Sequence, residues 1–149
     1  MKKKTIWILF LSFFLFVNLY AEDKFVSLKK DKVNVRYGPS MDSPIKYIYK
    51  KKNLPIKQID KKENWRRIID LRNNSGWIHT SQLKEKSNSI IVLEDKILFK
   101  KPSNFSKPIA RLELGRLLII KKCENNWCKI TTGNYSGWIK ADNVWGSIK

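Results

Sequence analysis

The sequence predicts an all-β protein that consists of two tandem small β-barrels after an N-terminal signal helix. Three landmarks occur twice in the same order, 63, 62 and 61 residues apart: Pro39-Ser40 and Pro102-Ser103, Trp65 and Trp127, and Gly76-Trp77 and Gly137-Trp138. The apolar segments around them are short, β-branched and bounded by turn formers, and they lack the spacing of an amphipathic helix. A single module has therefore been duplicated along the chain.

Each copy contains a series of short candidate strands. They cover residues 26–29, 33–37, 45–49, 54–60, 65–70 and 76–79 in the first copy, and 90–93, 97–100, 108–112, 116–123, 127–131 and 137–139 in the second. Strands this short protect their apolar faces when the sheet curls into a small barrel. Because "KEKSNS" at 84–89 has no apolar residue, we expect a first domain over residues 22–84, a linker over 85–89 and a second domain over 90–149.

The N-terminal segment is typical of a cleavable secretory signal. Three lysines follow Met1 and precede a stretch from Ile6 to Val17 that is apolar except for Ser12. A helix of that length rises only about 18 Å, short of a hydrocarbon layer of roughly 30 Å, so export is favoured over a membrane anchor. We expect cleavage after Ala21, with residues 1–21 as the signal peptide and a periplasmic or secreted mature protein.

The chain is strongly basic. Its formal net charge of +18 becomes +15 when residues 1–21 and their three lysines are removed. Such a charge would attract an anionic polymer or an anionic membrane surface. A composition rich in Lys, Ile and Asn, with lysine outnumbering arginine 25 to 6, also arises by codon drift in an AT-rich genome, so both explanations stay open.

Three motifs of the first copy form a set that indicates a family. They are "VNVRYGPS" at 33–40, "ENWRRI" at 63–68 and "SGWIHTSQL" at 75–83. The second copy has "ILFKKPS" at 97–103, "NNWCKI" at 125–130 and "SGWIKADNV" at 136–144, which match the later elements but not the first. Over residues 25–145 the chain resembles exported proteins with tandem bacterial SH3-like (SH3b) domains. The resemblance implies SH3-like small barrels and a ligand groove that borders the first long loop.

The opening motif supplies the first candidate ligand-binding residues. In a half-buried strand Val33 and Val35 face one side, so Asn34 and Arg36 project from the barrel beside the first loop. The planar guanidinium of Arg36 suits a carboxylate, and the peptide stems of a bacterial wall present carboxylates. Alternatively, Asn34 and Arg36 bond loop carbonyls and only hold the shape of the loop.

Three aromatic residues of the first copy complete the candidate site: Tyr37, Trp65 and Trp77. Aromatic faces suit the CH surfaces of sugars and of extended peptides. We expect Tyr37 to be exposed at the loop mouth. For Trp77, packing in the core or at its edge is the favoured alternative, because Gly76 lets a neighbouring backbone approach closely.

The second copy lacks the polar residues of this motif. We expect Leu98 to stand at the position of Asn34, and Lys101 at that of Tyr37, with Trp127 and Trp138 as the other equivalents. The second module has then lost the site, or it uses Leu98 and its neighbour at position 99 to pack on the first module.

The remaining reactive side chains indicate structure and not catalysis. Cys123 and Cys128 flank a predicted hairpin, and export favours a disulfide between them. Because a zinc site needs four ligands and His79 is the only histidine, we expect no metal and no cofactor. Two barrels leave no room for the separate catalytic domain of wall cysteine peptidases, so we expect no enzymatic activity.

Three functions are compatible with these features. The first hypothesis is a non-catalytic exported module that binds a peptide or peptidoglycan component, so its partner is a cell-wall peptide or glycan, or an envelope protein. The second is a charge-driven binder of an anionic polymer or membrane surface, whose affinity falls steeply with salt. Export argues against nucleic acid as that polymer. The third is a protein scaffold without a groove ligand.

Overall fold

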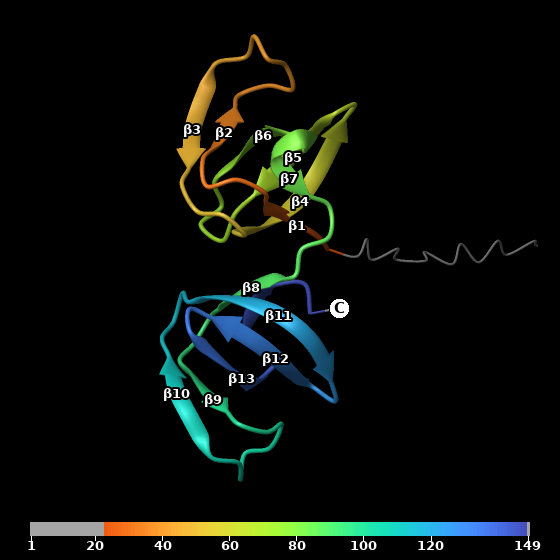
Figure 1. Cartoon of the computed structure of the whole chain (residues 1–149). Coiled ribbons are helices and arrows are strands. Elements are labelled where there is room, and N and C mark those ends of the chain that lie inside the picture. Colours follow the sequence, from red (N-terminus) through yellow and green to blue (C-terminus); the bar gives the residue numbers. More distant parts are fainter. Residues whose placement is uncertain (1–22, 149) are drawn as a thin grey trace, which may run out of the picture.

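The computed structural model describes residues 23–148, which form two antiparallel sheets, one for each sequence copy. The predicted signal helix and the cleavage site after Ala21 lie outside the described residues. Within residues 23–148, no helix has the length and apolar character needed to cross a membrane. The all-β class and the duplication are confirmed, and Figure 1 shows the two sheets one above the other.

The first sheet follows the predicted strands closely. Its elements are β1 (Lys24–Leu28), β2 (Val33–Arg36), β3 (Ile45–Tyr49), β4 (Pro55–Lys62), β5 (Trp65–Ile69), β6 (Ser75–His79), the 3₁₀ turn η1 (Thr80–Gln82) and β7 (Leu83–Lys84). The strands lie in the order β3-β2-β6-β5-β4-β1-β7. This order brings β2, which carries the opening motif, beside β6, which carries the Gly-Trp motif.

The second sheet repeats this arrangement. Its strands are β8 (Ser89–Val92), β9 (Lys96–Phe99), β10 (Pro108–Leu112), β11 (Leu117–Glu124), β12 (Trp127–Thr132), β13 (Tyr135–Lys140) and β14 (Val144–Gly146). They lie in the order β10-β9-β13-β12-β11-β8-β14, in which β14 takes the place that β7 has in the first sheet.

Each sheet curls around its own core but stays open. The edge strands β3 and β7 of the first sheet, and β10 and β14 of the second, are not paired with each other in the described part of the chain. The predicted barrels are therefore curled sheets with two free edges. A curled sheet covers its apolar face almost as well as a closed one, because both surround the same core.

The core of the first sheet comes from the predicted inward positions. Val33 and Val35 of β2 and Ile78 of β6 are fully buried, and they pack in one cluster with the apolar residues of β1, β4 and β5. Gly76 brings β6 against β2, because a Cβ atom there would lie 3.0 Å from the carbonyl oxygen of Arg36 and would also clash with the side chain of Val35. The close approach that the sequence predicted at Gly76 is confirmed.

The core of the second sheet contains one half of a disulfide. Cys128 of β12 is fully buried with Leu98, Leu118 and Ile130, and Cys123 of β11 packs against the same cluster. The two cysteines pair directly across the β11–β12 hairpin and are disulfide-bonded, as predicted. The bridge therefore joins the two strands next to the turn of the hairpin and links this end to the core.

Asparagine supplies most of the tight turns. Among the described non-glycine residues, five asparagines and one glutamate have a positive φ: Asn53, Asn73, Asn125, Asn126, Asn143 and Glu63. Asparagine tolerates the left-handed region better than other residues that have a Cβ atom. The high asparagine content therefore has a structural use in a chain with few glycines.

The two domains contact each other through the last strand. Residues 85–88 connect β7 to β8, and β14 pairs with β8 at the junction. From β14, the indole Nε1 of Trp145 donates a hydrogen bond to the carbonyl oxygen of Pro55 over 3.0 Å. The Trp145 ring also meets Phe25 edge to face at 5.1 Å, and Ser89 Oγ donates to the carbonyl oxygen of Asn53 over 2.6 Å. These contacts join one domain to the other directly.

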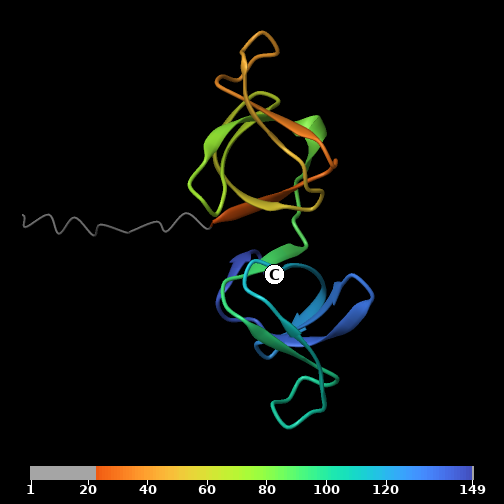
Figure 2. The same ribbon diagram turned by 90° about the vertical axis from the view of Figure 1, so that its left-hand side faces the viewer.

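The long loops after β2 and β9 lie at the far ends of the molecule. Figures 1 and 2 both show the loop over residues 37–44 at the top and the loop over residues 100–107 at the bottom, with the junction between them. The opening motif of the first copy therefore faces away from the second domain.

Candidate functional site

Sheet pairing gathers the predicted site residues on the outer face of the first domain. Arg36 of β2 pairs with Trp77 of β6, and Trp77 pairs with Arg67 of β5. Residues paired directly across antiparallel strands project from the same face, so these three side chains form one row. Asn34 projects from the same face, because it lies two residues before Arg36 in β2.

Trp65 stands on this face but is largely covered. It pairs with His79 across β5 and β6, and the two rings meet edge to face at 5.2 Å. Only 7% of Trp65 is exposed. His79 Nδ1 accepts a hydrogen bond from the backbone N–H of Ser81 and so caps η1. Trp65 therefore supports the face more than it presents a surface to a ligand.

The Arg36 side chain is held in place by the first loop. Its Nη1 donates to the carbonyl oxygen of Ser43 over 2.7 Å, which joins the start of the loop to its end. The loop-holding role considered for Arg36 therefore exists. A guanidinium has five N–H donors, so one bond fixes its orientation and leaves donors for a ligand. The backbone N–H of Asn34 donates to Gln82 Oε1 at 3.4 Å.

A small pocket opens where the loop meets the row. It has a volume of about 140 Å³, and its lining comprises Tyr37, Lys46, Arg67, Ser75, Gly76 and Trp77. Tyr37 is 64% exposed, as predicted, and Lys46 Nζ lies 5.5 Å from the centroid of its ring. Trp77 is half-buried at the pocket wall and lies outside the core cluster, so it packs at the edge of the core and also lines the pocket.

The pocket brings positive charge and aromatic surface together. Lys46 and Arg67 line it, and Arg36 lies beside it in the same row as Trp77. Lys46 Nζ donates to the carbonyl oxygen of Ser75 over 2.9 Å, which holds the ammonium group at the pocket. Clustered cations beside aromatic faces suit an anionic group on an otherwise apolar ligand.

Sequence reasoning identified two of the lining residues, Tyr37 and Trp77, and missed Lys46 and Arg67. Asn34 and Trp65 do not line the pocket, although they share its face. The signal for Arg67 was its position two residues after Trp65 in the same strand, which places both on one side of the sheet. Lys46 lies in β3 at the irregularity of its pairing with β2, and no local pattern indicates it.

No metal centre accompanies this pocket. Within residues 23–148, no three His, Cys, Asp or Glu side chains gather in a way that could hold a metal ion. The outer face presents charged, hydrogen-bonding and aromatic side chains.

The family of the chain follows from its sequence profile. The profile of the family described as Bacterial SH3 domain matches residues 29–85 and residues 95–146, one match in each sheet. The chain belongs to the bacterial SH3 domain family. The two matches are the tandem copies that the repeated landmarks predicted.

Several solved structures are similar to this bacterial SH3 protein. NlpC2 from Trichomonas vaginalis has 13% identity and a TM-score of 0.39, with 86% of this chain and 49% of that chain covered. NlpC1 from Trichomonas vaginalis has 12% identity and a TM-score of 0.39, with 87% and 48% covered. An NlpC/P60 family protein from Bacillus cereus has 13% identity and a TM-score of 0.36, with 81% and 55% covered. The chain thus spans about half the length of each, and no curated protein matches it.

The second SH3 domain corrects one expectation about equivalent residues. Phe99 pairs with Trp138 as Arg36 pairs with Trp77, so Phe99 is the equivalent of Arg36. The residue at the position of Asn34 is therefore Ile97. The expected equivalence of Leu98 with Asn34 was therefore wrong by one residue. Leu98 also does not pack on the first domain, because it is fully buried in the core of its own domain.

The outer face of the second SH3 domain is apolar where that of the first is polar. Ile97 is 41% exposed, and Phe99 meets Trp127 edge to face at 5.8 Å. Trp138 is nearly buried, and Lys122 Nζ lies 5.2 Å from the centroid of its ring. In the corrected alignment, the equivalent of Tyr37 is Lys100 and not Lys101. The second domain thus keeps the fold but not the cationic pocket, because the pocket beside Ile97 and Phe99 is lined by both acidic and basic side chains.

Proposed function

We propose that this tandem bacterial SH3 protein is a non-catalytic module of the cell envelope whose first domain binds a carboxylate-bearing peptide of the cell wall. The observation that carries the proposal is the row of Arg36, Trp77 and Arg67, with Tyr37 and Lys46 closing a pocket beside it. Sequence motif, strand pairing and loop position all converge on this one face.

The size of the pocket favours one end of a ligand. Pockets for complete small molecules usually have volumes of about 300–1,000 Å³. A pocket of about 140 Å³ takes a group as small as a carboxylate with its adjoining carbons. The remainder of an extended peptide would then lie across the exposed ring of Tyr37, which is how aromatic-lined grooves bind extended chains.

The envelope location is supported by two features of the chain. The disulfide between Cys123 and Cys128 is typical of proteins in an oxidising compartment. The sequence before residue 22 is typical of a secretory signal. A protein in that compartment meets wall peptides directly.

Retention on purified wall sacculi tests the proposed site. We expect Arg36→Ala and Tyr37→Ala each to lower the retained fraction, with about a tenfold loss of affinity for the arginine change, because a charge-assisted hydrogen bond is lost. The matched controls are Arg111→Ala and Tyr135→Ala, which alter exposed residues of the second domain. Equal retention of all four variants would remove the outer face as the site.

A salt series separates this function from charge-driven binding. Binding that rests on the net charge, +15 for residues 22–149, falls steeply and continuously with salt, whichever lysine is changed. Binding in the pocket keeps its dependence on Tyr37 at all salt concentrations, since aromatic contact is not screened. The same incubations should release no soluble wall fragments, because the proposed module is non-catalytic.

Binding of an envelope protein is a second candidate, and the apolar face of the second domain favours it. Phe105 in the loop over residues 100–107 is fully exposed, and Ile97 is 41% exposed on the neighbouring strand. Crosslinking in cells from a cysteine placed at Phe105 would capture one protein repeatedly if this face docks. Crosslinks to wall material alone would count against it.

A further inference from the structure

A second and larger pocket lies at the junction of the two domains. It has a volume of about 590 Å³, and none of the five sequence-predicted site residues lines it. Strand β3, the start of β4 and the turn between β5 and β6 supply most of the lining, and Ile91 and Gly115 contribute from the second domain. Its volume falls within the usual range of small-molecule sites, about 300–1,000 Å³.

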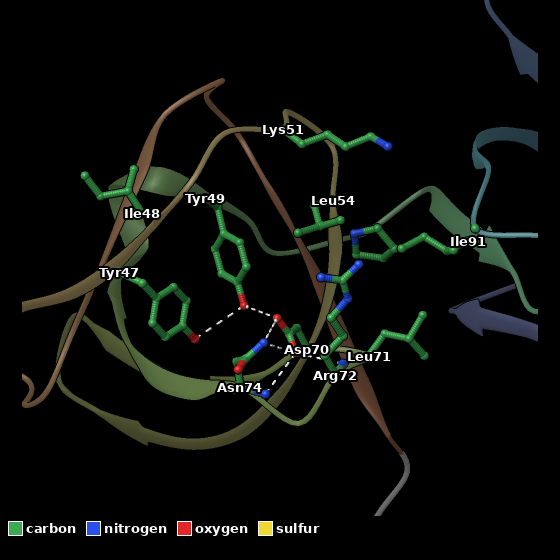
Figure 3. A pocket seen from close by; sticks show the side chains of 12 residues that line it. Tyr47, Ile48, Tyr49, Lys51, Leu54, Asp70, Leu71, Arg72, Asn74 and Ile91 are labelled. Atoms are coloured by element: carbon green, nitrogen blue, oxygen red, sulfur yellow. Dashed lines mark hydrogen bonds between the residues drawn. The ribbon is translucent and has the colours of Figure 1, made fainter.

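A chain of hydrogen bonds runs along one wall of this junction pocket. Tyr49 Oη donates to Asp70 Oδ2 over 2.9 Å, and Tyr47 Oη lies 3.4 Å from Tyr49 Oη. Figure 3 shows the two phenols and the carboxylate in line. The rings of Tyr47 and Tyr49 stand edge to face, with centroids 5.2 Å apart.

The direction of this chain is fixed by Asp70. Partial burial acts to raise the pKa of Asp70, but hydrogen bonds from Asn74, Tyr49 and the backbone of Arg72 outweigh it and lower the pKa. Burial, together with Tyr47 and Asp70, raises the pKa of Tyr49, so its phenol stays protonated. An ionised Asp70 only accepts, so Tyr49 donates to it, and Tyr47 in turn donates to Tyr49.

The end of the chain is an acceptor that faces the pocket. Tyr47 has used its one proton, so its oxygen offers lone pairs and can accept from an O–H or N–H of a ligand. The acceptor positions of Asp70 are already used within the protein, since its oxygens also accept from the backbone N–H of Arg72 and from the backbone and side chain of Asn74. Asp70 is therefore a positioning residue.

Two cations lie on the other side of the pocket. Within residues 23–148, the side-chain nitrogens of Lys51 and Arg72 make no hydrogen bond or ion pair. The lining also includes the apolar side chains of Leu54, Leu71 and Ile91. Figure 3 shows Arg72 and Leu71 across from the tyrosine rings. A ligand must therefore offer an apolar face, a hydrogen-bond donor and a negative charge.

We propose that the junction pocket binds a sugar residue that carries a carboxylate. A pyranose presents an apolar CH face to the rings, a hydroxyl or acetamido N–H to Tyr47 Oη, and its carboxylate to Lys51 and Arg72. An acidic peptide could offer the same groups, but a flexible chain loses more conformational freedom on binding than a rigid ring does. This site is separate from the outer face of the first domain and does not require it.

Binding of two related sugars to the purified protein tests the proposal. The probes are N-acetylmuramic acid and N-acetylglucosamine, which differ by the lactyl carboxylate, and calorimetry measures their affinities. We expect the acid to bind about tenfold more tightly, the usual effect of a charge-assisted hydrogen bond. Lys51→Ala with Arg72→Ala should remove that difference, whereas Lys52→Ala, an exposed neighbour outside the lining, should keep it.

A second variant tests the acceptor. Tyr47→Phe keeps the ring and removes the oxygen, so it should weaken both sugars several-fold without unfolding the domain. Amide resonances of Ile91 and Gly115 should shift on binding, which locates the sugar in the junction pocket and not on the outer face of the first domain. Equal affinity for the two sugars, binding without a shift at Ile91 and Gly115, an alanyl-glutamate dipeptide that shifts these two resonances at lower concentration than the sugar acid, or absence of binding at millimolar sugar would overturn the proposal.

Discussion

At the scale of single residues, Asp70 organises the turn between β5 and β6. Its carboxylate accepts from the backbone N–H groups of Arg72 and Asn74, from the Asn74 side chain and from the phenol of Tyr49. One half-buried aspartate thus holds a turn in which Asn73 has a positive φ. Asp and Asn side chains commonly stabilise turns in this way.

The lowered pKa of Asp70 predicts a specific loss of stability in acid. The folded-state pKa lies below the unfolded value of about 3.9, so its contribution is present above that value and is lost as the pH falls through the folded pKa. We expect Asp70→Asn to lower the free energy of unfolding at pH 7 by about 1 kcal/mol, because solvent partly screens the carboxylate. The deficit relative to the unmodified protein should shrink below about pH 4.

Urea unfolding at pH 7 and at pH 3 measures this difference. Asp31→Asn is the control, since Asp31 is exposed and its side chain makes no hydrogen bond within residues 23–148. A deficit of the Asp70 variant that is the same at both pH values would contradict the assignment.

At the scale of the secondary structure, the contact between β2 and β6 depends on the absence of a side chain at Gly76. A methyl group there would press on the stiff, buried side chain of Val35 and on the carbonyl oxygen of Arg36. We expect Gly76→Ala to lower the free energy of unfolding by about 1–3 kcal/mol, the usual cost of overpacking.

Thermal unfolding followed by circular dichroism gives this cost. Ser75→Ala in the same strand is the matched control, and it should be close to neutral because Ser75 Oγ is buried without a hydrogen-bond partner. If Gly76→Ala were as stable as Ser75→Ala, the contact between β2 and β6 would not depend on the absence of a side chain at residue 76.

The hairpin of β11 and β12 should depend on its disulfide. Cys123 and Cys128 are only five positions apart, so the bridge closes a small loop and should stabilise by about 2 kcal/mol through the entropy of the unfolded chain. Reduction should therefore speed hydrogen exchange in the second domain, while the first domain, which has no cysteine, provides the internal reference. Unchanged exchange in β11 and β12 after reduction would contradict the expectation.

The strands were predictable because their signals are local. Alternation in "VNVR" at 33–36 gave both the inward valines and the outward Asn34 and Arg36. The predicted equivalence of Leu98 with Asn34 was wrong, because the two copies were matched by the similar outline of their motifs and not by the separation of their landmarks. The 63-residue separation of Pro39 and Pro102 gives the correct alignment of the two copies, in which Ile97 is the equivalent of Asn34.

At the scale of the whole molecule, the relation between the domains could not be predicted. Trp145 follows the last landmark and belongs to no repeated motif, yet it contacts Phe25 and Pro55 of the first domain. The junction pocket likewise combines Tyr47 with Ile91, which are far apart in the sequence. Residue alternation cannot indicate such contacts, because they depend on how two finished sheets meet.

The Trp145 contact predicts coupled unfolding of the two domains. Trp145→Phe keeps an aromatic ring near Phe25 but loses the hydrogen bond to Pro55, a loss of about 1 kcal/mol of coupling. Calorimetry should then show two transitions that lie farther apart than in the unmodified protein. Trp127→Phe, on the outer face of the second domain, is the control, and an identical change in both variants would refute a specific coupling.

The position of Trp145 also bears on how long the protein survives among proteases. Proteases cut where a segment opens locally, and an edge strand such as β14 opens more readily than a central one. Once β14 leaves, Phe25 loses its cover and the first domain exposes apolar surface of its own. Damage to either half should therefore lead to removal of both, so that cells do not accumulate single domains.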